Sequence, residues 1–567
     1  MVAQFSHSII SQPPPPSVMI STMTITSTQP DRGLIRERLI PQTPVSATST
    51  SRTNTGVQRD SVYYSGVTST CSPHFTRIDL CLSNNAISDF PLEEVTLLSL
   101  RLESRVRARQ VADTFAKRPV LGVNIINLSH GAALGWVSPY LPVLMNPDQD
   151  ILDTGPVTIE QGSWIGSILC LGALFGAFLY GFMVEKVGIK RTLQALVVPH
   201  SAFWIITCLA TSVTQLYLAR FLAGLSGGGI IVVFPLFIAD ISDKKIRGIL
   251  GSFLALTSNG GILLMYVIGD VLSYRTVALS MLVLPLIFTI LMCFIPDTPQ
   301  TCLKMGRPIE AERCFMFYRG IKTPAEKTSA FRQEFDNMEK FIEHNAGQSS
   351  RVTLADFQSR EAKLGLFIGV FLMFINQFCG VFAILTYAAS IFAGVGSTLD
   401  PNTSAIIMGT IQIVGTLSSF VFVDLAGRKV LLIVSTFGTG LGLLLLAVFN
   451  WFTGNGAEQW LQDYSWFPIV SLSATVYLFS IGLCNIPFFV LPELLPPKIC
   501  NVGNTLSMVS ITIFSFISLK IFPIMVEVIK LYGALGLFAG ISFAGVAMIA
   551  LIVPETKGKN LIGPQNV

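Results

Sequence analysis

Twelve apolar stretches, each long enough to cross a lipid bilayer, limit most strongly how this chain can fold. About 20 apolar residues in a helix span the hydrocarbon core, where every backbone polar group must be bonded within the chain. Each stretch therefore predicts a transmembrane α-helix. They lie near residues 119–145, 162–184, 192–213, 215–239, 249–270, 276–296, 364–392, 403–423, 430–451, 467–492, 502–526 and 531–553.

The composition agrees with a chain that lives in lipid. Only 13% of the 567 residues are charged, whereas soluble proteins carry about 25%. The predicted fold class is an all-α membrane protein, with the lipid bilayer as its main surroundings. The formal net charge of +4 gives no reason to expect a nucleic-acid partner. None of the ten cysteines has metal-ligand spacing, so no cofactor, metal or disulfide framework is expected.

The segment before the first apolar stretch divides into two parts. Residues 1–95 are rich in Ser, Thr and Pro and lack apolar periodicity, which predicts a disordered tail and no signal peptide. Residues 96–118 carry six basic side chains. Two interpretations stay open for them: a helix over 97–118 that contacts anionic lipid, or a solvated basic linker.

Basic residues predict the orientation of the chain in the membrane. The loop after the first stretch carries four acids and no base, whereas the loops after even-numbered stretches carry Lys and Arg. Because Lys and Arg favour the cytosolic side, both termini and the long middle loop are predicted to be cytosolic, in a plasma-membrane protein. The remaining segments are an N-terminal six-helix lobe, a cytosolic helical loop, a C-terminal six-helix lobe and a cytosolic tail, at 119–296, 297–363, 364–553 and 554–567.

Three short motifs recur in the two halves of the chain. "GFMVEKVGIKRTL" after the second stretch matches "FVFVDLAGRKVLL" after the eighth, with an acid, a glycine and two bases in the same order. "FIADISDKKIRG" similarly matches "VLPELLPPKICN", and "FIPDTPQ" matches "IVPETKG". Since all three pairs keep the same order and nearly the same spacing, we predict two six-helix halves related by a pseudo-repeat, as in two-lobed transporters.

These motifs also carry a family resemblance. Together with "GWVSPYLP", "SNGGILL", "LPPKI" and "FISLK", they resemble the sugar porters of the major facilitator superfamily, and in pattern most of all the insect facilitated trehalose transporters. The resemblance covers nearly all of residues 119–559. It implies the major facilitator fold, a small-molecule sugar as substrate, no enzymatic activity, and a mid-membrane cavity that opens alternately to each side.

The resemblance also implies a cytosolic gate made of charged residues at the helix ends. Acids and bases there bridge the lobes in one state and separate in the other. The alternative is that these charges follow the positive-inside rule and anchor helix ends. Ile189, Gln300 and Cys500 stand where the family has bases, so we expect a weaker lock of the outward-open state. The gate residues are Glu185, Lys186, Asp240, Arg247, Asp424, Arg428, Lys429 and Glu493.

A sugar presents hydroxyl groups and an apolar face, so its site needs amide side chains beside aromatic rings. The resemblance places this site on the seventh, eighth, tenth and eleventh stretches. Several family positions are altered, which predicts a more apolar cavity than in typical hexose carriers. Interhelical hydrogen bonding is the alternative for each amide, and we favour it for Asn259. The predicted substrate-binding residues are Asn376, Gln377, Phe382, Gln412, Phe488 and Thr512.

Whether transport is coupled to protons depends on one arginine–carboxylate pair in the membrane. Proton-coupled relatives oppose an arginine in the fourth stretch to a carboxylate in the first; here Arg220 is present, but Ala133 stands at the carboxylate position. His130 could titrate, although a packed histidine is the simpler interpretation. We therefore predict facilitative transport of trehalose or a hexose. A non-transporting sugar sensor and proton-coupled uptake are the alternatives, and the sequence does not fix the sugar.

Overall fold

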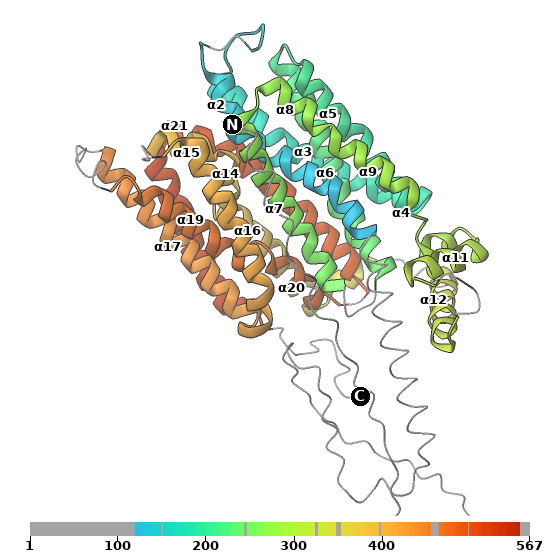
Figure 1. Cartoon of the computed structure of the whole chain (residues 1–567). Helices are drawn as coiled ribbons and strands as arrows, with labels where there is room; N and C mark the ends of the chain where they lie inside the picture. The colour runs from blue at the N-terminus through green and yellow to red at the C-terminus, as the bar shows by residue number, and fades with distance from the viewer. Residues whose placement is uncertain are drawn as a thin grey trace, which may run out of the picture. The chain divides into compact units, whose positions relative to one another are not determined.

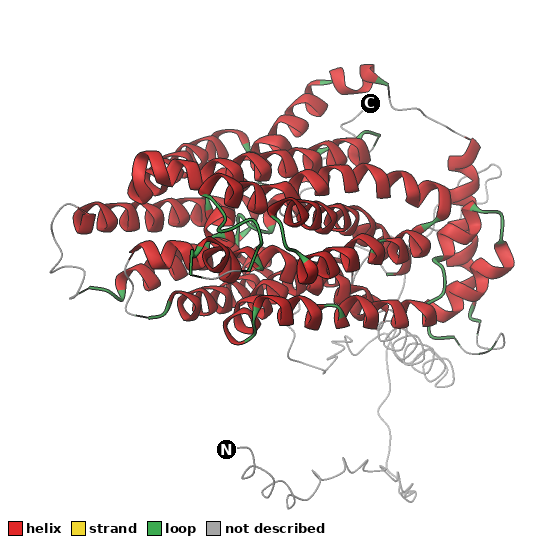
Figure 2. Cartoon of the chain, turned by 90° about the horizontal axis from the view of Figure 1, so that it is seen from above, coloured by secondary structure: helices red, strands yellow, loops and turns green. Residues whose placement is uncertain are grey.

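The structure, a computed structural model, describes residues 119–148, 151–242, 247–321, 323, 327–347, 353–395, 399–454, 464–496 and 498–555. Within these residues every regular element is helical (Figure 2). The predicted tail 1–95, the basic segment 96–118 and residues 556–567 lie outside the described residues. The predicted all-α fold class is confirmed for the part of the chain that the structure describes.

The first half of the chain supplies six membrane-crossing segments. The first is Pro119–Met145, whose last part is α2 (Val137–Met145). The others are α3 (Ile159–Val187), α4 (Ile189–Ala195) with α5 (Val197–Leu209), α6 (Val213–Ile241), α7 (Arg247–Val271), and α8 (Tyr274–Met281) with α9 (Val283–Phe294). Helices α3 and α6 pack against each other with glycines at the contact, because a Cβ at Gly172 or Gly224 would overlap a backbone carbonyl of the other helix.

A helical loop follows α9. It contains α10 (Pro299–Lys304), α11 (Pro308–Tyr318), α12 (Ser329–Gly347) and the 3₁₀ helix η2 (Leu354–Gln358). Thr298 caps α10 by accepting from the Thr301 amide, and Pro299 occupies the first turn, where its missing N–H costs nothing. Helix α12 packs on α11 through Phe331 and Phe315, whose ring centroids lie 4.9 Å apart.

The second half contains α13 (Arg360–Phe378), α14 (Val381–Thr386), α15 (Ala388–Val395), α16 (Pro401–Ala426), α17 (Arg428–Gly454), α19 (Phe467–Ile481), α20 (Ile486–Leu494) and α21 (Cys500–Ile552). Among the described residues, 11 helices are long and apolar enough to span a membrane, and the last of these covers 51 residues. A straight helix of that length would measure about 77 Å, more than twice the hydrocarbon thickness. It turns at Lys530, whose φ is 61°, so it holds the two predicted stretches 502–526 and 531–553.

Several predicted stretches are interrupted in the structure, and residues 364–392 are the clearest case. Residues 364–392 are not one continuous helix but α13, α14 and α15 in series. The first break occurs at Gly380, whose φ of 81° belongs to the left-handed region that glycine adopts without strain. A Cβ at this position would also overlap the Phe538 ring of α21. The break therefore follows from one glycine that both turns the chain and admits a neighbouring ring.

The predicted pseudo-repeat has a direct structural counterpart. Gly188, before α4, has φ 87° and ψ 170°, and Gly427, before α17, has φ 87° and ψ 163°. Both turns lie on one membrane face. The loop that links the halves packs on Gly188 through Thr301 and pairs with Lys498 through Asp356 at 2.6 Å. Glu493, shortly before Lys498, pairs in turn with Arg428 beside Gly427 at 2.9 Å. We call this face the motif face and the other one the opposite face.

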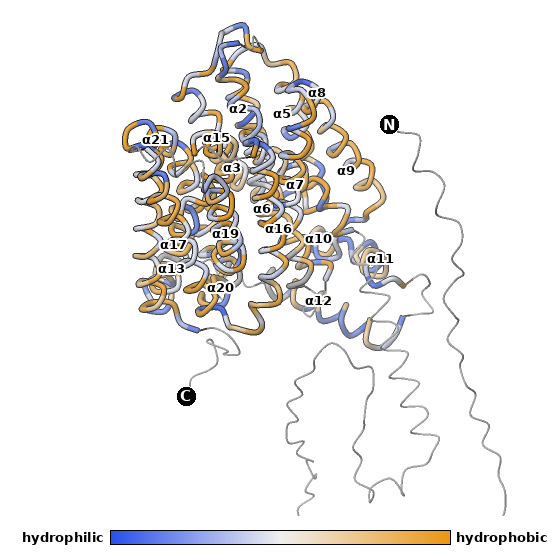
Figure 3. Tube along the Cα trace, turned by 60° about the vertical axis from the view of Figure 1, so that its left-hand side comes forward, coloured by the Kyte–Doolittle hydropathy of each residue, from blue (hydrophilic) through white to orange (hydrophobic). Residues whose placement is uncertain are grey.

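The two halves form two lobes that lie side by side in Figure 1, the first coloured blue to green and the second amber to red. Helix α3 packs against α21, and α7 against α16, across the contact. Large apolar side chains are exposed on the spanning helices, for example Phe182 at 60% and Leu551 at 81%, as lipid-facing positions require. Figure 3 shows this as orange along the spans, whereas hydrophilic blue gathers on α12.

Candidate substrate-binding site and gates

Two adjacent amides end α13, directly before the Gly380 break. Asn376 Nδ2 donates to the carbonyl of Leu483 at 2.6 Å, where α19 gives way to α20. Gln377 Nε2 donates to Asn376 Oδ1 at 2.7 Å. Gln377 Oε1 is buried and has no hydrogen-bond partner among the described residues. Asn376 therefore holds two helix breaks together and orients Gln377, whose oxygen stays available to a donor.

Gln412 of α16 lies at the contact between the lobes. Its Nε2 donates to Asn259 Oδ1 of α7 at 3.2 Å, and Asn259 Nδ2 donates to Thr416 Oγ1 at 2.8 Å. The predicted interhelical role of Asn259 is confirmed, and its bonds join one lobe to the other. Gln412 Oε1 is buried and, like Gln377 Oε1, has no partner within the described part of the chain.

The other predicted substrate residues lie apart from these amides. Phe382 is half-buried against the main core. Phe488 packs in a separate cluster with Leu491 and Leu495, toward the motif face. Thr512 donates to the carbonyl of Val509 at 2.8 Å within its own helix. Among the described residues no hydrogen bond links any of the three to Gln377 or Gln412.

Cross-lobe contacts between these amides and the opposite face were not expected from the sequence. Tyr266 of α7 donates its hydroxyl to the carbonyl of Leu385. Ser138 of α2 accepts from the Ala389 amide at 3.1 Å. Both contacts use a backbone group as partner, and backbone groups leave no signal in a residue pattern. Together with Asn259, they fasten the lobes from the membrane midpoint to the opposite face.

Arg220 of α6 is 2% exposed and lies inside the first lobe. Its Nε donates to the carbonyl of Ile165 at 3.0 Å, and its Nη1 donates to the carbonyl of Ala133. The guanidinium carbon lies 5.9 Å from the Trp136 ring centroid. No carboxylate pairs with Arg220 among the described residues, so carbonyl dipoles and an aromatic face stabilise its charge.

Two histidines pack near Arg220. The ring nitrogens of His200 lie 2.8 Å from the hydroxyls of Ser129 and Ser226, so both are satisfied. His130 packs against Gly227, where a Cβ would overlap its ring. His130 is 6% exposed and fits the packed histidine that we favour from the sequence.

The described gate residues of the second lobe contact partners in that lobe. Arg428 Nη2 lies 2.9 Å from Glu493 Oε1. The amides of Arg428 and Lys429 both donate to the Glu555 carboxylate at 3.1 Å, which places an anion at the start of α17, where the helix dipole favours it. Lys429 Nζ donates to the carbonyl of Ala550 at 2.7 Å.

The gate residues of the first lobe are less enclosed. Asp240 accepts from Thr298 Oγ1 at 2.8 Å. Lys186 Nζ lies 5.6 Å from the Phe182 ring centroid on its own helix, and Glu185 is exposed. The side chains of Arg247 and Asp424 lie outside what the structure describes. In this state the gate contacts given above stay within a lobe or reach the adjoining loop.

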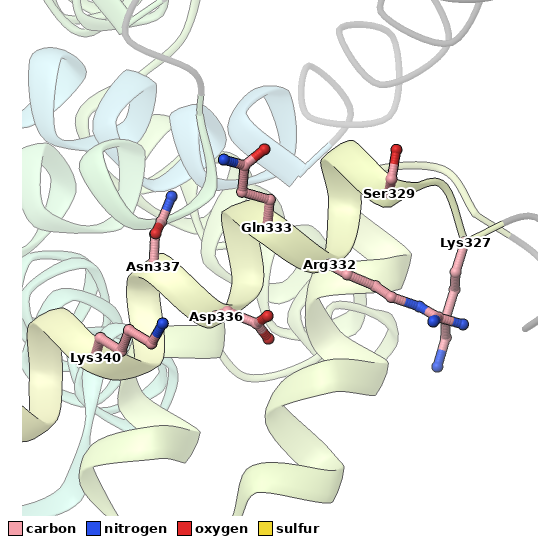
Figure 4. A pocket seen from close by; sticks show the side chains of 7 residues that line it. All are labelled: Lys327, Ser329, Arg332, Gln333, Asp336, Asn337 and Lys340. Carbon is pink, nitrogen blue, oxygen red and sulfur yellow. The ribbon is translucent and has the colours of Figure 1, made fainter. Parts of the chain in front are cut away.

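One groove on the described surface lies on the helical loop, not in the membrane. Figure 4 shows its lining side chains, which come from α12 and the turn before it. It is lined by Lys327, Ser329, Arg332, Gln333, Asp336, Asn337 and Lys340. A hydrophilic face of a single helix lacks the enclosure and the aromatic wall that a sugar site needs, so we do not place the substrate there.

The family model described as "Sugar (and other) transporter" matches residues 130–567. The chain is similar to the facilitated trehalose transporter Tret1 of Apis mellifera ligustica, with 30% identity over 445 residues, covering 78% of this chain and 86% of that protein.

Solved structures show the same fold. The inward-open conformation of the xylose transporter XylE from E. coli matches with a TM-score of 0.63 and 18% identity, covering 78% of this chain and 98% of that one. A second structure, described as the proton:xylose symporter XylE bound to 6-bromo-6-deoxy-D-glucose, matches with a TM-score of 0.61 and 19% identity, covering 79% and 98%. At these identities the likeness concerns the fold alone.

Proposed function

Because the chain belongs to the sugar transporter family of the major facilitator superfamily, we propose that it is a facilitative carrier of trehalose or a hexose in the plasma membrane. It is a transporter and not an enzyme. The sugar binds between the lobes, and the lobes rock about it so that each face opens in turn.

The surroundings of Arg220 carry the facilitative part of the proposal. A proton-coupled cycle needs a buried group that gains and loses a proton. At the place where a carboxylate would face Arg220, the chain offers the backbone carbonyl of Ala133, which does not titrate. Two backbone carbonyls already accept from the guanidinium of Arg220. Its positive charge is therefore stabilised without a partner that binds and releases a proton.

The two free amide oxygens support a sugar as the bound molecule. An unsatisfied buried acceptor costs about 1–3 kcal/mol. Gln377 Oε1 and Gln412 Oε1 are both in this condition, and sugar hydroxyls are donors that would satisfy them. Asn376 positions Gln377, whereas Phe382, Phe488 and Thr512 complete the proposed cavity in other states of the cycle.

The proposed orientation has the motif face in the cytosol, with both termini, the helical loop 297–363 and the eight gate residues on that side. The cross-lobe bonds of Ser138, Tyr266 and Asn259 keep the opposite face closed here. The gate residues then form their cross-lobe pairs when the motif face closes. We propose that residues 97–118, in the helical interpretation, contact anionic lipid.

Labelled sugar flux in sealed vesicles that contain the full chain tests the proposal. We expect exchange of labelled trehalose or glucose that never exceeds equilibrium and changes by less than about twofold when a proton gradient is applied. Accumulation driven by the gradient would instead establish proton coupling. Sugar binding without any flux would establish the sensor, an alternative that no contact described above favours.

A further inference from the structure

A single lysine stands in the otherwise apolar second half of the first α21 crossing. Lys520 lies twenty residues after Cys500, so about 30 Å of helix separates it from the motif face. Because the hydrocarbon core is about 30 Å thick, Lys520 lies near the opposite face, where its ammonium group still needs partners or water. No carboxylate among the described residues lies within ion-pair distance of it.

The partners of Lys520 both belong to the other lobe. Its Nζ donates to Ser163 Oγ of α3 at 2.8 Å. The same nitrogen lies 4.3 Å from the ring centroid of Trp164, within cation–π range. Ser163 Oγ uses its own proton toward the carbonyl of Glu160 at 2.7 Å, so its lone pair is free to accept from the ammonium group.

The neighbours of this contact are packed tightly across the lobes. Phe516, one turn before Lys520, lies 6.0 Å from Trp164 between ring centroids. Tyr387, between α14 and α15, donates its hydroxyl to the carbonyl of Leu519 at 3.1 Å. That hydroxyl presses on Gly166 of α3, where a Cβ would overlap it. These neighbours pack against one side of the contact, and the Lys520 side chain is half-buried there.

We propose that Lys520 is a gate residue of the opposite face, in addition to the cross-lobe bonds of Ser138, Tyr266 and Asn259. Its ammonium group bridges the lobes while that face is closed and releases Ser163 and Trp164 when the face opens. This role rests on the proposed alternating access. In the open state, water in the cavity hydrates the ammonium group, so the contact biases the equilibrium without locking it. Lys520 thus sets how much of the protein has its opposite face open.

Accessibility labelling of the full chain tests this role without any transported sugar. The reporter is Ala389→Cys, because Ala389 is 3% exposed at the closed rim. A membrane-impermeant maleimide is added from the opposite face, and modification is followed by mass spectrometry on the peptide that carries position 389. This experiment measures labelling and not sugar flux. A wrong sugar assignment would therefore leave the labelling result unchanged, whereas a wrong role for Lys520 would change it.

Lys520→Met keeps an unbranched side chain of similar length and removes the charge. We therefore expect labelling of Cys at position 389 to become at least about fivefold faster. Lys520→Arg keeps the cation and the donor, so its rate should stay within about twofold of the parent. Lys530→Met is the matched control: Lys530 is exposed in the turn of the same helix and should leave the rate unchanged.

An unchanged rate in Lys520→Met would overturn the proposal, as would an equal increase in Lys520→Arg. Size-exclusion profiles check that each variant is folded. If Lys520→Met does not fold, Ser163→Ala, which removes the acceptor but no charge, takes its place. It should raise the labelling rate by at least about twofold, and an unchanged rate there overturns the role.

Discussion

The two membrane faces of this protein are held in different ways. At the opposite face, side chains of one lobe bond to the other: Ser138 to Ala389, and Lys520 to Ser163. At the motif face, the described ion pair of Arg428 and Glu493 lies within the second lobe. The first arrangement must break when the lobes rock, whereas the second can persist. In the proposed cycle, the contacts at the opposite face therefore determine the state, and the ion pair at the motif face stiffens the second lobe.

Cross-linking the opposite face should have the largest effect. Ser138→Cys with Ala389→Cys puts two thiols on residues that already touch, since Ser138 Oγ accepts from the Ala389 backbone amide at 3.1 Å. Oxidation should reduce labelled sugar flux by more than about tenfold, and reduction should restore it, because the lobes can no longer separate there. Flux that survives complete cross-linking would show that this rim does not open.

Wild-type protein under the same oxidant is the control for that experiment. Its Cys302 and Cys314 sulfurs lie 4.0 Å apart inside the helical loop. Burial raises the pKa of the Cys314 thiol to about 12, so little thiolate is present to react. A bond between them would stay within the loop, and the flux of the wild type should not fall.

The midpoint between the faces should show the next largest effect. Gln377→Ala removes the free Oε1 acceptor and the bond to Asn376, and we expect the flux at low sugar concentration to fall by roughly 10- to 100-fold. Gln161→Ala, at the start of α3, is the control, because it loses only a capping contact and should keep its flux. Equal rates in the two variants would remove Gln377 from the site.

Substitution of the repeated glycines measures the rigidity of the motif face. An alanine at Gly188 or Gly427 must adopt a φ of 87° with an extended ψ, a region almost exclusive to glycine, which costs about 1–3 kcal/mol of unfolding free energy. Gly188→Ala should be worse, because its Cβ would also overlap the Thr301 side chain. Melting temperatures should fall for both variants. Gly536→Ala is the control, because a Cβ there meets open space and its melting temperature should not fall. A lower melting temperature for this variant would indicate general fragility of the helices.

The exposed pair of Lys498 and Asp356 should show the smallest effect. Donation from Lys498 lowers the pKa of Asp356 to about 2. Because the pKa of Asp356 is lower in the folded than in the unfolded protein, the pair stabilises the folded state at every pH above the unfolded pKa, near 3.9. This stabilisation is lost as the pH falls through the folded pKa of about 2. The Tm difference between wild type and Asp356→Asn should therefore stay small and constant from pH 5 to 8, and shrink in high salt. A difference that varies across this range would contradict the assigned pair.

Much of the fold could be predicted from the sequence, because hydrophobic length and the paired motifs are local signals. The two crossings within α21 were separable, since the apolar run is interrupted near Lys530. The break at Gly380 was missed, because one glycine in an apolar run is also compatible with a continuous helix. It depends on Phe538, which is remote in sequence.

The site was harder to predict for the same reason. Gln377 and Gln412 could be named from the family positions that they occupy, but Asn376 bonds to a backbone carbonyl of another segment, which has no sequence signature. Phe488 was placed in the cavity, whereas in this state it packs toward the motif face. The partners of Lys520 belong to a helix more than 350 residues earlier, so neither half alone reveals the contact.

Paired spin-label distances at both faces test most directly the claim that the lobes rock about a central site. One pair labels exposed Ile159 and Val528 at the opposite face, and the other labels exposed Arg191 and Ala426 at the motif face. On addition of trehalose or glucose to the reconstituted full chain, we predict that one distance lengthens while the other shortens. Distances that both stay fixed with sugar bound, or that change in the same direction, would contradict the account.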